Sequence, residues 1–194
     1  MDNQFNAELV LRGYSVGIFP MGDKNGISWY SADPRFVIDL DNFHVPKRLA
    51  RKYRQRVFDM RVDTVFDEVI ALCAARDQTW ITEEIIRVYT ELFELGFAHS
   101  IEAFQGDQLA GGLYGVSIGG AFMGESMFYR VSDASKICLV YLAEHLKARG
   151  YTILDSQFVS PQTQYLEQFG GKLIPRSEYL RRLAKAIQLD CKFN

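Results

Sequence analysis

Residues 119–136, GGAFMGESMFYRVSDASK, gather charged and hydroxyl side chains where a strand-like segment passes through a turn into the start of a helix. Such a junction commonly holds a phosphate or a cofactor, because a helix N-terminus attracts negative charge. Ser135 and Lys136 suit a phosphate or a ribose there, although they could equally cap the helix. Glu125 lies in an apolar run, where a charge must be paired or used. The plainer alternative for Glu125 is a salt bridge with Arg130.

A second chemically useful pair lies in the segment LDSQF. Asp155 and Gln157 are two positions apart in a strand predicted over residues 151–158, so both side chains are expected on one face of it. A glutamine is a poor base, but its carbonyl oxygen can hold and orient an N–H group that a neighbouring carboxylate polarises. The plainer alternative is two polar residues at a strand end that bind nearby backbone.

The bulk composition indicates one soluble globular domain with at most a small appendage. The chain has 194 residues, of which 48% are hydrophobic and 24% charged, values that are ordinary for a protein with a real core. The net charge of −2 does not by itself point to a polyanionic partner. Residues 47–56, KRLARKYRQR, are nevertheless strongly basic, and they form either a phosphate-contacting surface or a solvated amphipathic helix.

The sequence shows no pattern typical of a targeting signal or a membrane-spanning segment. The N-terminus MDNQFNAELVLRGYSVG has no basic segment followed by an apolar run, so we expect no signal peptide. No stretch approaches the roughly 18 apolar residues of a membrane span. Cys73, Cys138 and Cys191 are odd in number and lack metal-ligand spacing, which suits a reducing compartment. We therefore expect a cytoplasmic protein without membrane contact or bound metal.

The pattern of apolar residues predicts the elements that must position these side chains. One helix is expected to begin at Thr82 as N-cap and to stop at Gly96. Consecutive antiparallel strands are expected over 98–104, 108–117 and 120–128, with QGDQ as a hairpin turn. The remaining predicted helices cover residues 6–16, 46–55, 64–74, 133–149, 161–169 and 177–188, and the remaining strands cover 35–40, 58–63 and 151–158.

This order of elements excludes an all-parallel Rossmann sheet and predicts an α+β or mixed α/β fold. The last part of the chain, a helix, a strand and a helix that ends in YLEQFGGKLIPR, looks like the second half of a GNAT-type acyltransferase. A coenzyme A-dependent GNAT enzyme needs glycines where its long helix begins, so that backbone N–H groups can approach the pyrophosphate. Residues 130–136, RVSDASK, contain no glycine. We therefore expect a different acyl donor, and a coenzyme A-dependent N-acetyltransferase is the alternative.

The motifs GIFPM, SWYSADPR, TWIT, LGFAHSIEAF, GGLYGV, GESMFYR, DASK and LDSQF occur in this order along the chain. In order and rough spacing they resemble the leucyl/phenylalanyl-tRNA–protein transferases, from about residue 8 to 183. Each motif alone would be a weak signal. The combination of GESMF, SK and Asp-x-Gln is specific to that family.

The resemblance implies an enzyme that moves Leu or Phe from its tRNA to the N-terminal Arg or Lys of an acceptor protein, which marks that protein for degradation. Met is a third possible donor. Its partners would be aminoacyl-tRNA and such acceptor proteins. The resemblance also implies a small N-terminal domain, placed here at residues 1–34, a GNAT-like domain at residues 35–194, and no metal or organic cofactor.

The resemblance also implies roles for single residues. Gln157 and Asp155 would act on the attacking α-amine, which must lose a proton. Trp80 would stack on the terminal adenine of the tRNA, an interaction of roughly 1–3 kcal/mol; otherwise it is a core residue. Tyr89 would line the substrate pocket or simply pack, and Glu125 would lie beside the aminoacyl group. The pocket for the transferred side chain would be formed by Leu113, Met127, Leu139, Leu142, Leu146 and Leu154.

The basic segment would contact tRNA phosphates without sequence specificity. The residues expected to do so are Lys47, Arg48, Arg51, Lys52, Arg54 and Arg56.

Four positions depart from the family pattern. Met21 stands where the family often has a second Trp, so the clamp on the adenine would be incomplete or completed by Trp29 or Tyr30. Tyr165 stands near the place of a common His. Leu142 and Leu146 look aromatic in better-known members, so the pocket would be roomier here. Met21 and Tyr165 make a non-catalytic tRNA-binding module a further alternative, against which the Asp155–Gln157 pair argues.

Overall fold

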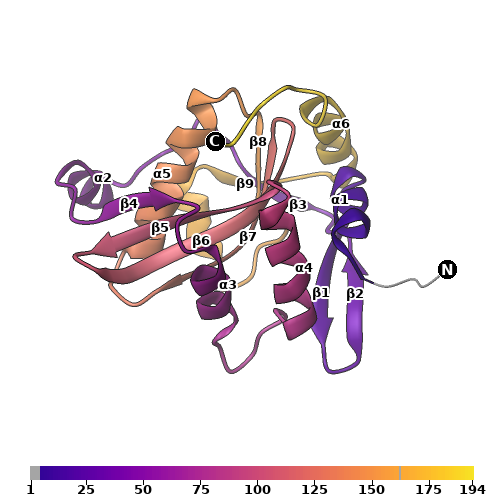
Figure 1. Ribbon diagram of the computed structural model, residues 1–194. Coiled ribbons are helices and arrows are strands. Elements are labelled where there is room, and N and C mark those ends of the chain that lie inside the picture. Colours follow the sequence, from indigo (N-terminus) through magenta and orange to yellow (C-terminus); the bar gives the residue numbers. More distant parts are fainter. Residues whose placement is uncertain (1–4, 162) are drawn as a thin grey trace.

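A sheet of seven strands runs through the computed structural model, which describes residues 5–161 and 163–194 (Figure 1). The strand order is β4-β5-β6-β7-β8-β3-β9. Neighbouring strands pair antiparallel except β7 and β8, which run parallel. The strands are β3 (Arg35–Ile38), β4 (Asp59–Val62), β5 (Ala98–Gln105), β6 (Gln108–Ile118), β7 (Ala121–Tyr129), β8 (Ile153–Asp155) and β9 (Gly171–Ile174).

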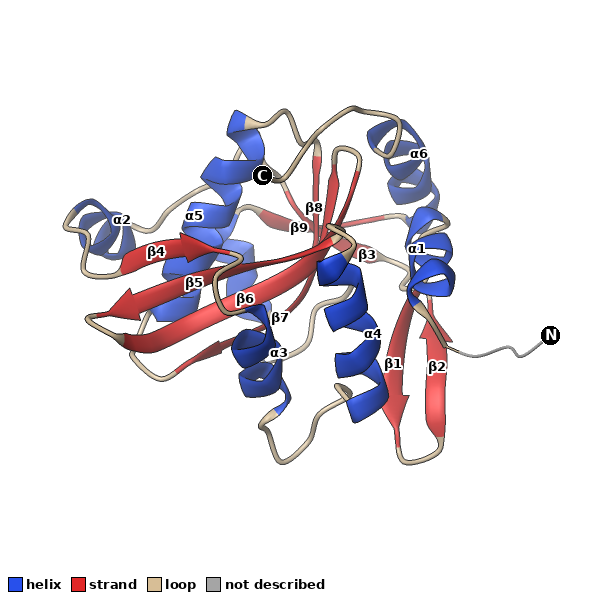
Figure 2. Cartoon of the chain, viewed as in Figure 1, coloured by secondary structure: helices blue, strands red, loops and turns tan. Residues whose placement is uncertain are grey.

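Helices cover both faces of this sheet, and each face has its own apolar core (Figure 2). One core is formed with α1 (Ala7–Ser15), α3 (Phe66–Ala74), α4 (Glu83–Glu94) and α6 (Arg176–Ala186), and we call that side the α4 face. The other is formed with α2 (Lys47–Arg54), α5 (Ala134–Ala148) and the 3-10 helix η1 (Gln164–Phe169), and we call it the α5 face. The predicted mixed α+β fold is thereby confirmed.

The predicted limits of α4 are confirmed in atomic detail. The Thr82 hydroxyl accepts a hydrogen bond from the Ile85 N–H at 3.4 Å, which satisfies one of the free donors at the helix start. Gly96 ends the helix with a φ of 78°, a left-handed conformation that glycine adopts without steric cost. This helix carries Tyr89 on its buried side.

Three strands were not predicted. β1 (Phe19–Asp23) and β2 (Gly26–Tyr30) form a separate antiparallel hairpin, although Asn25-Gly26 is a hairpin-turn signal. The edge strand β9 is short and lies between the 3-10 helix η1 and the helix α6. The predicted strand 151–158 was in turn too long, because β8 ends at Asp155.

Residues 5–34 share their core with the rest of the chain. Val10, Tyr14 and Phe19 are almost fully buried and belong to the same apolar cluster as Ile85 and Tyr89 of α4. The division into domains at residues 34 and 35 remains a proposal. None of the helices described is both long and apolar enough to cross a bilayer.

Candidate active site

The candidate site lies where the two parallel strands β7 and β8 separate. They pair from Ala121 with Ile153 to Met123 with Asp155, and β8 ends there. The helix α5 connects them, so they form a strand–helix–strand unit. Ligands of parallel sheets usually bind beyond the carboxyl ends of the strands. Glu125 and Gln157 each lie two residues past the last pair, one on each diverging segment.

Glu125 owes its position to an extra residue in β7. Tyr114 of β6 is opposite Ser126, whereas the next residue, Gly115, is opposite Gly124. Glu125 therefore has no partner across the ladder, which defines a β-bulge. A bulge redirects side chains, and it turns the Glu125 carboxylate toward Tyr14 on the α4 face.

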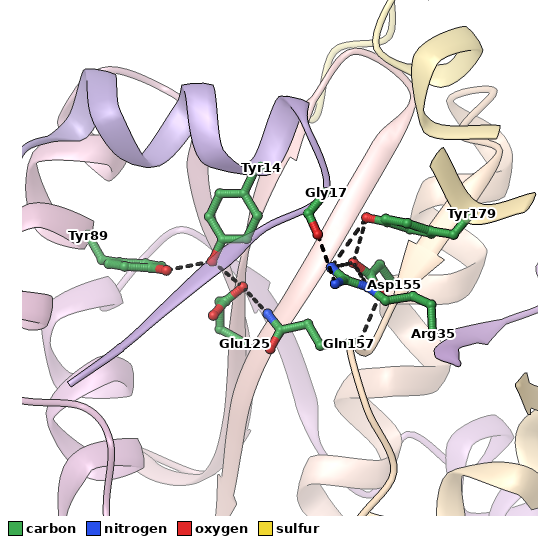
Figure 3. Close-up of polar contacts among 8 residues, drawn as sticks. All are labelled: Tyr14, Gly17, Arg35, Tyr89, Glu125, Asp155, Gln157 and Tyr179. Atoms are coloured by element: carbon green, nitrogen blue, oxygen red, sulfur yellow. Dashed lines mark hydrogen bonds and ion pairs between the residues drawn. The ribbon is translucent and has the colours of Figure 1, made fainter. Parts of the chain in front are cut away.

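The Glu125 carboxylate forms the centre of a chain of hydrogen bonds (Figure 3). Its Oε1 accepts hydrogen bonds from the Tyr14 hydroxyl at 2.6 Å and from the Gln157 Nε2 at 2.8 Å. The Tyr14 hydroxyl lies 2.5 Å from that of Tyr89. The second oxygen, Oε2, is buried and has no hydrogen-bond partner among the residues described.

This environment raises the pKa of Glu125 to about 7. Burial is the main cause, since it penalises the charged form, while the hydrogen bonds from Tyr14 and Gln157 act in the opposite direction. Glu125 therefore changes charge near neutral pH. The alternative salt bridge with Arg130 is wrong, because Arg130 lies 3.6 Å from Glu68 instead.

Asp155 is fully buried in an ion pair with Arg35. Arg35 donates from Nη2 to Oδ2 at 2.6 Å and from Nε to Oδ1 at 2.9 Å, and Tyr179 donates its hydroxyl to Oδ2 at 2.8 Å. Arg35 also donates to the Gly17 carbonyl oxygen at 3.2 Å. Because Asp155 has no exposed surface, its carboxylate is not accessible to a substrate in this structure and instead holds neighbouring residues in place.

Gln157 is held in an unusual backbone conformation by Asp155. Its φ is 63°, which is uncommon for a residue other than glycine. Asp155 Oδ1 accepts the Gln157 backbone N–H at 2.8 Å, an Asx-turn contact that stabilises such a bend. The expectation that both side chains face the same way along a strand is therefore wrong. Asp155 contacts the Gln157 backbone, and Glu125 contacts its side-chain amide.

The five leucines of the expected pocket lie on the α5 face. All are at most 3% exposed and belong to the core of that face, and Met127 packs against it. Met127 also lies 2.8 Å from the Tyr165 hydroxyl through its sulfur. Glu125 and Tyr89 face the other core, so the structure separates the two groups of expected substrate contacts. The leucines are Leu113, Leu139, Leu142, Leu146 and Leu154.

Trp80 is half-buried beside the β1–β2 hairpin. Its carbonyl oxygen accepts the Gly22 N–H at 3.0 Å, which places it next to Met21, the other position of the expected adenine clamp. Trp29 packs on the same core, and Tyr30 is 45% exposed.

The start of α5 differs from a phosphate-binding loop. Asp133 precedes the helix with a φ of 73°, and Ser135 is buried against β6. Asp133 pairs with Lys52 at 2.7 Å and with Arg48 at 3.1 Å. The Asp133 carboxylate already occupies the positive end of the helix, and the exclusion of coenzyme A as the donor stays a prediction.

The basic segment forms α2 and the turn after it. Arg48 and Lys52 are engaged by Asp133, while the other four basic side chains are exposed. These four are Lys47, Arg51, Arg54 and Arg56.

Sequence reasoning missed Tyr14, Arg35 and Tyr179. Arg35 gave a signal, because a charge that opens the apolar strand RFVI must find a buried partner. The two tyrosines gave none, since aromatic residues in amphipathic helices are usually core.

Comparisons with known proteins match one family along nearly the whole chain. The sequence profile described as leucyl/phenylalanyl-tRNA protein transferase matches residues 37–184, and that of the corresponding N-terminal domain matches residues 3–33. Two relatives named leucyl/phenylalanyl-tRNA–protein transferase are similar to this chain over most of their length. The protein from Salinibacter ruber is 48% identical to it, over 98% of this chain and 84% of the relative. The protein from Gloeobacter violaceus is 50% identical to it, over 96% of each chain. The relative in Herpetosiphon aurantiacus is 45% identical over both full lengths.

Solved structures show a more distant likeness. The structure of L-PGS from Bacillus licheniformis has a TM-score of 0.49 at 12% identity and covers 94% of this chain and 70% of that one. A GCN5-related N-acetyltransferase-like protein from Streptococcus suis has a TM-score of 0.41 at 13% identity, over 86% of this chain and 63% of that one.

Proposed function

The chain belongs to the leucyl/phenylalanyl-tRNA–protein transferase family, and we propose that it transfers Leu or Phe from charged tRNA to the N-terminal Arg or Lys of acceptor proteins. The observation that supports this proposal best is the hydrogen-bonded pair of Glu125 and Gln157 where β7 and β8 separate. A pair of this kind can orient an amine for attack on an ester.

The reaction is aminolysis of the ester that joins the amino acid to the terminal ribose. The attacking α-amine must give up a proton as the C–N bond forms, and the ribose oxygen must gain one. Gln157 donates its Nε2 to Glu125, and its Oε1, which accepts no hydrogen bond from the residues described, can accept an N–H of the amine. The Asp155 carboxylate holds Gln157 in place by accepting its backbone N–H. An aminoacyl ester is already reactive, so that positioning supplies much of the acceleration.

The donor would pass the point where β7 and β8 separate, with its adenine on the α4 face and its amino-acid side chain on the α5 face. Trp80 would stack on the terminal adenine, with Met21 as its neighbour. Met127 and the leucines of the α5 face would surround the transferred side chain, and Ser135 would contact a phosphate or the ribose of the donor. An apolar lining favours Leu, Phe or Met over polar amino acids, because a polar side chain would be buried without partners.

A transfer assay tests this function directly. The wild-type protein is incubated with tRNA charged with labelled Leu, Phe or Met and with a peptide that begins with Arg or Lys. We expect label on the peptide with Leu or Phe, and none when the peptide N-terminus is acetylated, since the nucleophile is then blocked. Binding of the tRNA without any transfer would contradict the proposal and indicate a binding module.

The exposed arginines of α2 are proposed to contact tRNA phosphates. Replacing Arg51 and Arg54 with Ala should weaken tRNA binding and reduce the slope of log K against log salt by about one for each lost contact. The measurement is a binding titration at several salt concentrations. The matched control removes two exposed charges from α6, Arg181→Ala with Lys185→Ala. Equal effects of both double variants would mean that α2 contributes only net charge.

A further inference from the structure

The carboxylate that contacts the side-chain amide of Gln157 comes from the bulge in β7 and not from β8. Glu125 Oε1 lies 2.8 Å from Gln157 Nε2. Asp155 reaches only the Gln157 backbone, and its own carboxylate is occupied by Arg35 and Tyr179. Any polarisation of the Gln157 amide by a hydrogen-bonded carboxylate therefore originates at Glu125.

Glu125 is held by hydrogen bonds from α1 and from the segment after β8. Tyr14 of α1 donates to the same Oε1 and is itself tied to Tyr89 of α4. Burial and the charge of Glu125 raise the pKa of Tyr14 well above its ordinary value, so that Tyr14 stays protonated and remains a donor. Tyr114 of β6, Asp155 of β8 and Arg35 of β3 are the other titratable groups that influence Glu125 or are influenced by it.

We propose that Glu125, in its anionic form, is a positioning residue of the transfer reaction: it fixes and polarises the Gln157 amide so that Oε1 accepts the N–H of the attacking amine. This inference rests on the proposed function. It assigns Asp155 a different task, which is to hold the backbone of Gln157 in its left-handed conformation.

The proposed step conserves atoms and charge. The nitrogen of the acceptor forms a bond to the ester carbonyl carbon, and the bond from that carbon to the ribose oxygen breaks. Positive charge develops on the nitrogen during attack, and the Gln157 Oε1, made more negative by the Glu125 anion, stabilises it. The proton released by the nitrogen ends on the departing ribose oxygen. Glu125 and Gln157 are unchanged at the end.

The variant Glu125→Gln separates charge from shape. Its side-chain oxygen can still accept the hydrogen bonds of Tyr14 and Gln157, but the negative charge is lost. We expect kcat to fall by about a hundredfold with little change in KM for either substrate. The control Glu94→Gln, on the exposed side of α4, should behave as wild type.

The pH dependence supplies a readout that a purely structural role would not change. Glu125 has a raised pKa of about 7, so its anion is lost as the pH falls through that value. The acceptor α-amine is protonated below about 7.7–8.0. On the acid side, log kcat/KM for the acceptor should therefore rise with a slope near two in the wild type and near one in Glu125→Gln. A slope that stays the same in both proteins would overturn the inference.

Tyr14→Phe provides a second test if Glu125→Gln folds poorly. Loss of the Tyr14 hydrogen bond removes a contact that favours the anion, so the acid limb assigned to Glu125 should move up by about one pH unit. An unmoved limb would contradict the inference. Failure of the proposed function is distinct, because the wild type would then transfer no label at any pH.

Discussion

Replacing Gln157 with Asn is expected to lower the rate of aminoacyl transfer by about a hundredfold. Asparagine tolerates the left-handed backbone at this position, so the φ of 63° should be kept. Its side chain is one methylene shorter, and it cannot both contact Glu125 and present an oxygen to the amine. The measurement is single-turnover transfer of labelled Leu or Phe, with tRNA binding and thermal unfolding measured in parallel.

Gln188→Asn is the matched control, because Gln188 is exposed beyond α6. Both variants should bind tRNA and unfold as the wild type does. If Gln157→Asn transferred at the wild-type rate, the amide would have no part in the chemistry. If it lost tRNA binding as well, the defect would lie in the donor site and the assignment of Gln157 to the amine would be wrong.

The second large effect concerns the free energy of unfolding. Arg35→Met leaves the fully buried Asp155 without its counter-ion, and Asp155→Asn leaves Arg35 in the same state. Breaking a buried pair on one side typically costs about 3–5 kcal/mol, and we expect this for each variant. Both variants should also lose transfer activity, because the Asp155 side chain that holds the Gln157 backbone is no longer fixed by the ion pair. Urea unfolding at neutral pH measures the effect.

The double variant Arg35→Met with Asp155→Asn should be less destabilised than the sum of the single variants. Neither charge is then left alone, and the amide oxygen introduced by Asp155→Asn can still accept the N–H of Gln157. An interaction energy of about 0.5–3 kcal/mol is usual for residues in one network. Strict additivity would show that the ion pair contributes no coupling and that the losses arise from packing alone.

Local sequence signals predict most of the helices and strands. Thr82 and Gly96 define α4 because capping and left-handed termination depend on the residue itself and its immediate neighbours. The β1–β2 hairpin had a comparable signal in Asn25-Gly26, but the glycines and proline around it favoured a loop. The end of β8 could not be predicted from alternation, because the turn after it depends on the Asp155 side chain.

The site was predictable only in part, because its contacts join distant segments. The motifs indicated Asp155, Gln157 and Glu125, but their pairing depends on where β7 and β8 diverge. Tyr14 lies 111 positions from Glu125, and no local pattern connects them. A bulge cannot be recognised from one strand alone, since it is a property of the register between two strands.

The bulge also has a consequence for how this region can change over generations. A deletion that removed Glu125 would leave a regular ladder between β6 and β7, and such a ladder should be the more stable one. Selection for stability alone would therefore favour loss of the Glu125 codon, whereas selection for transfer activity would keep it. A length difference of one residue in GESMF is thus more informative about activity than several substitutions elsewhere in the sheet.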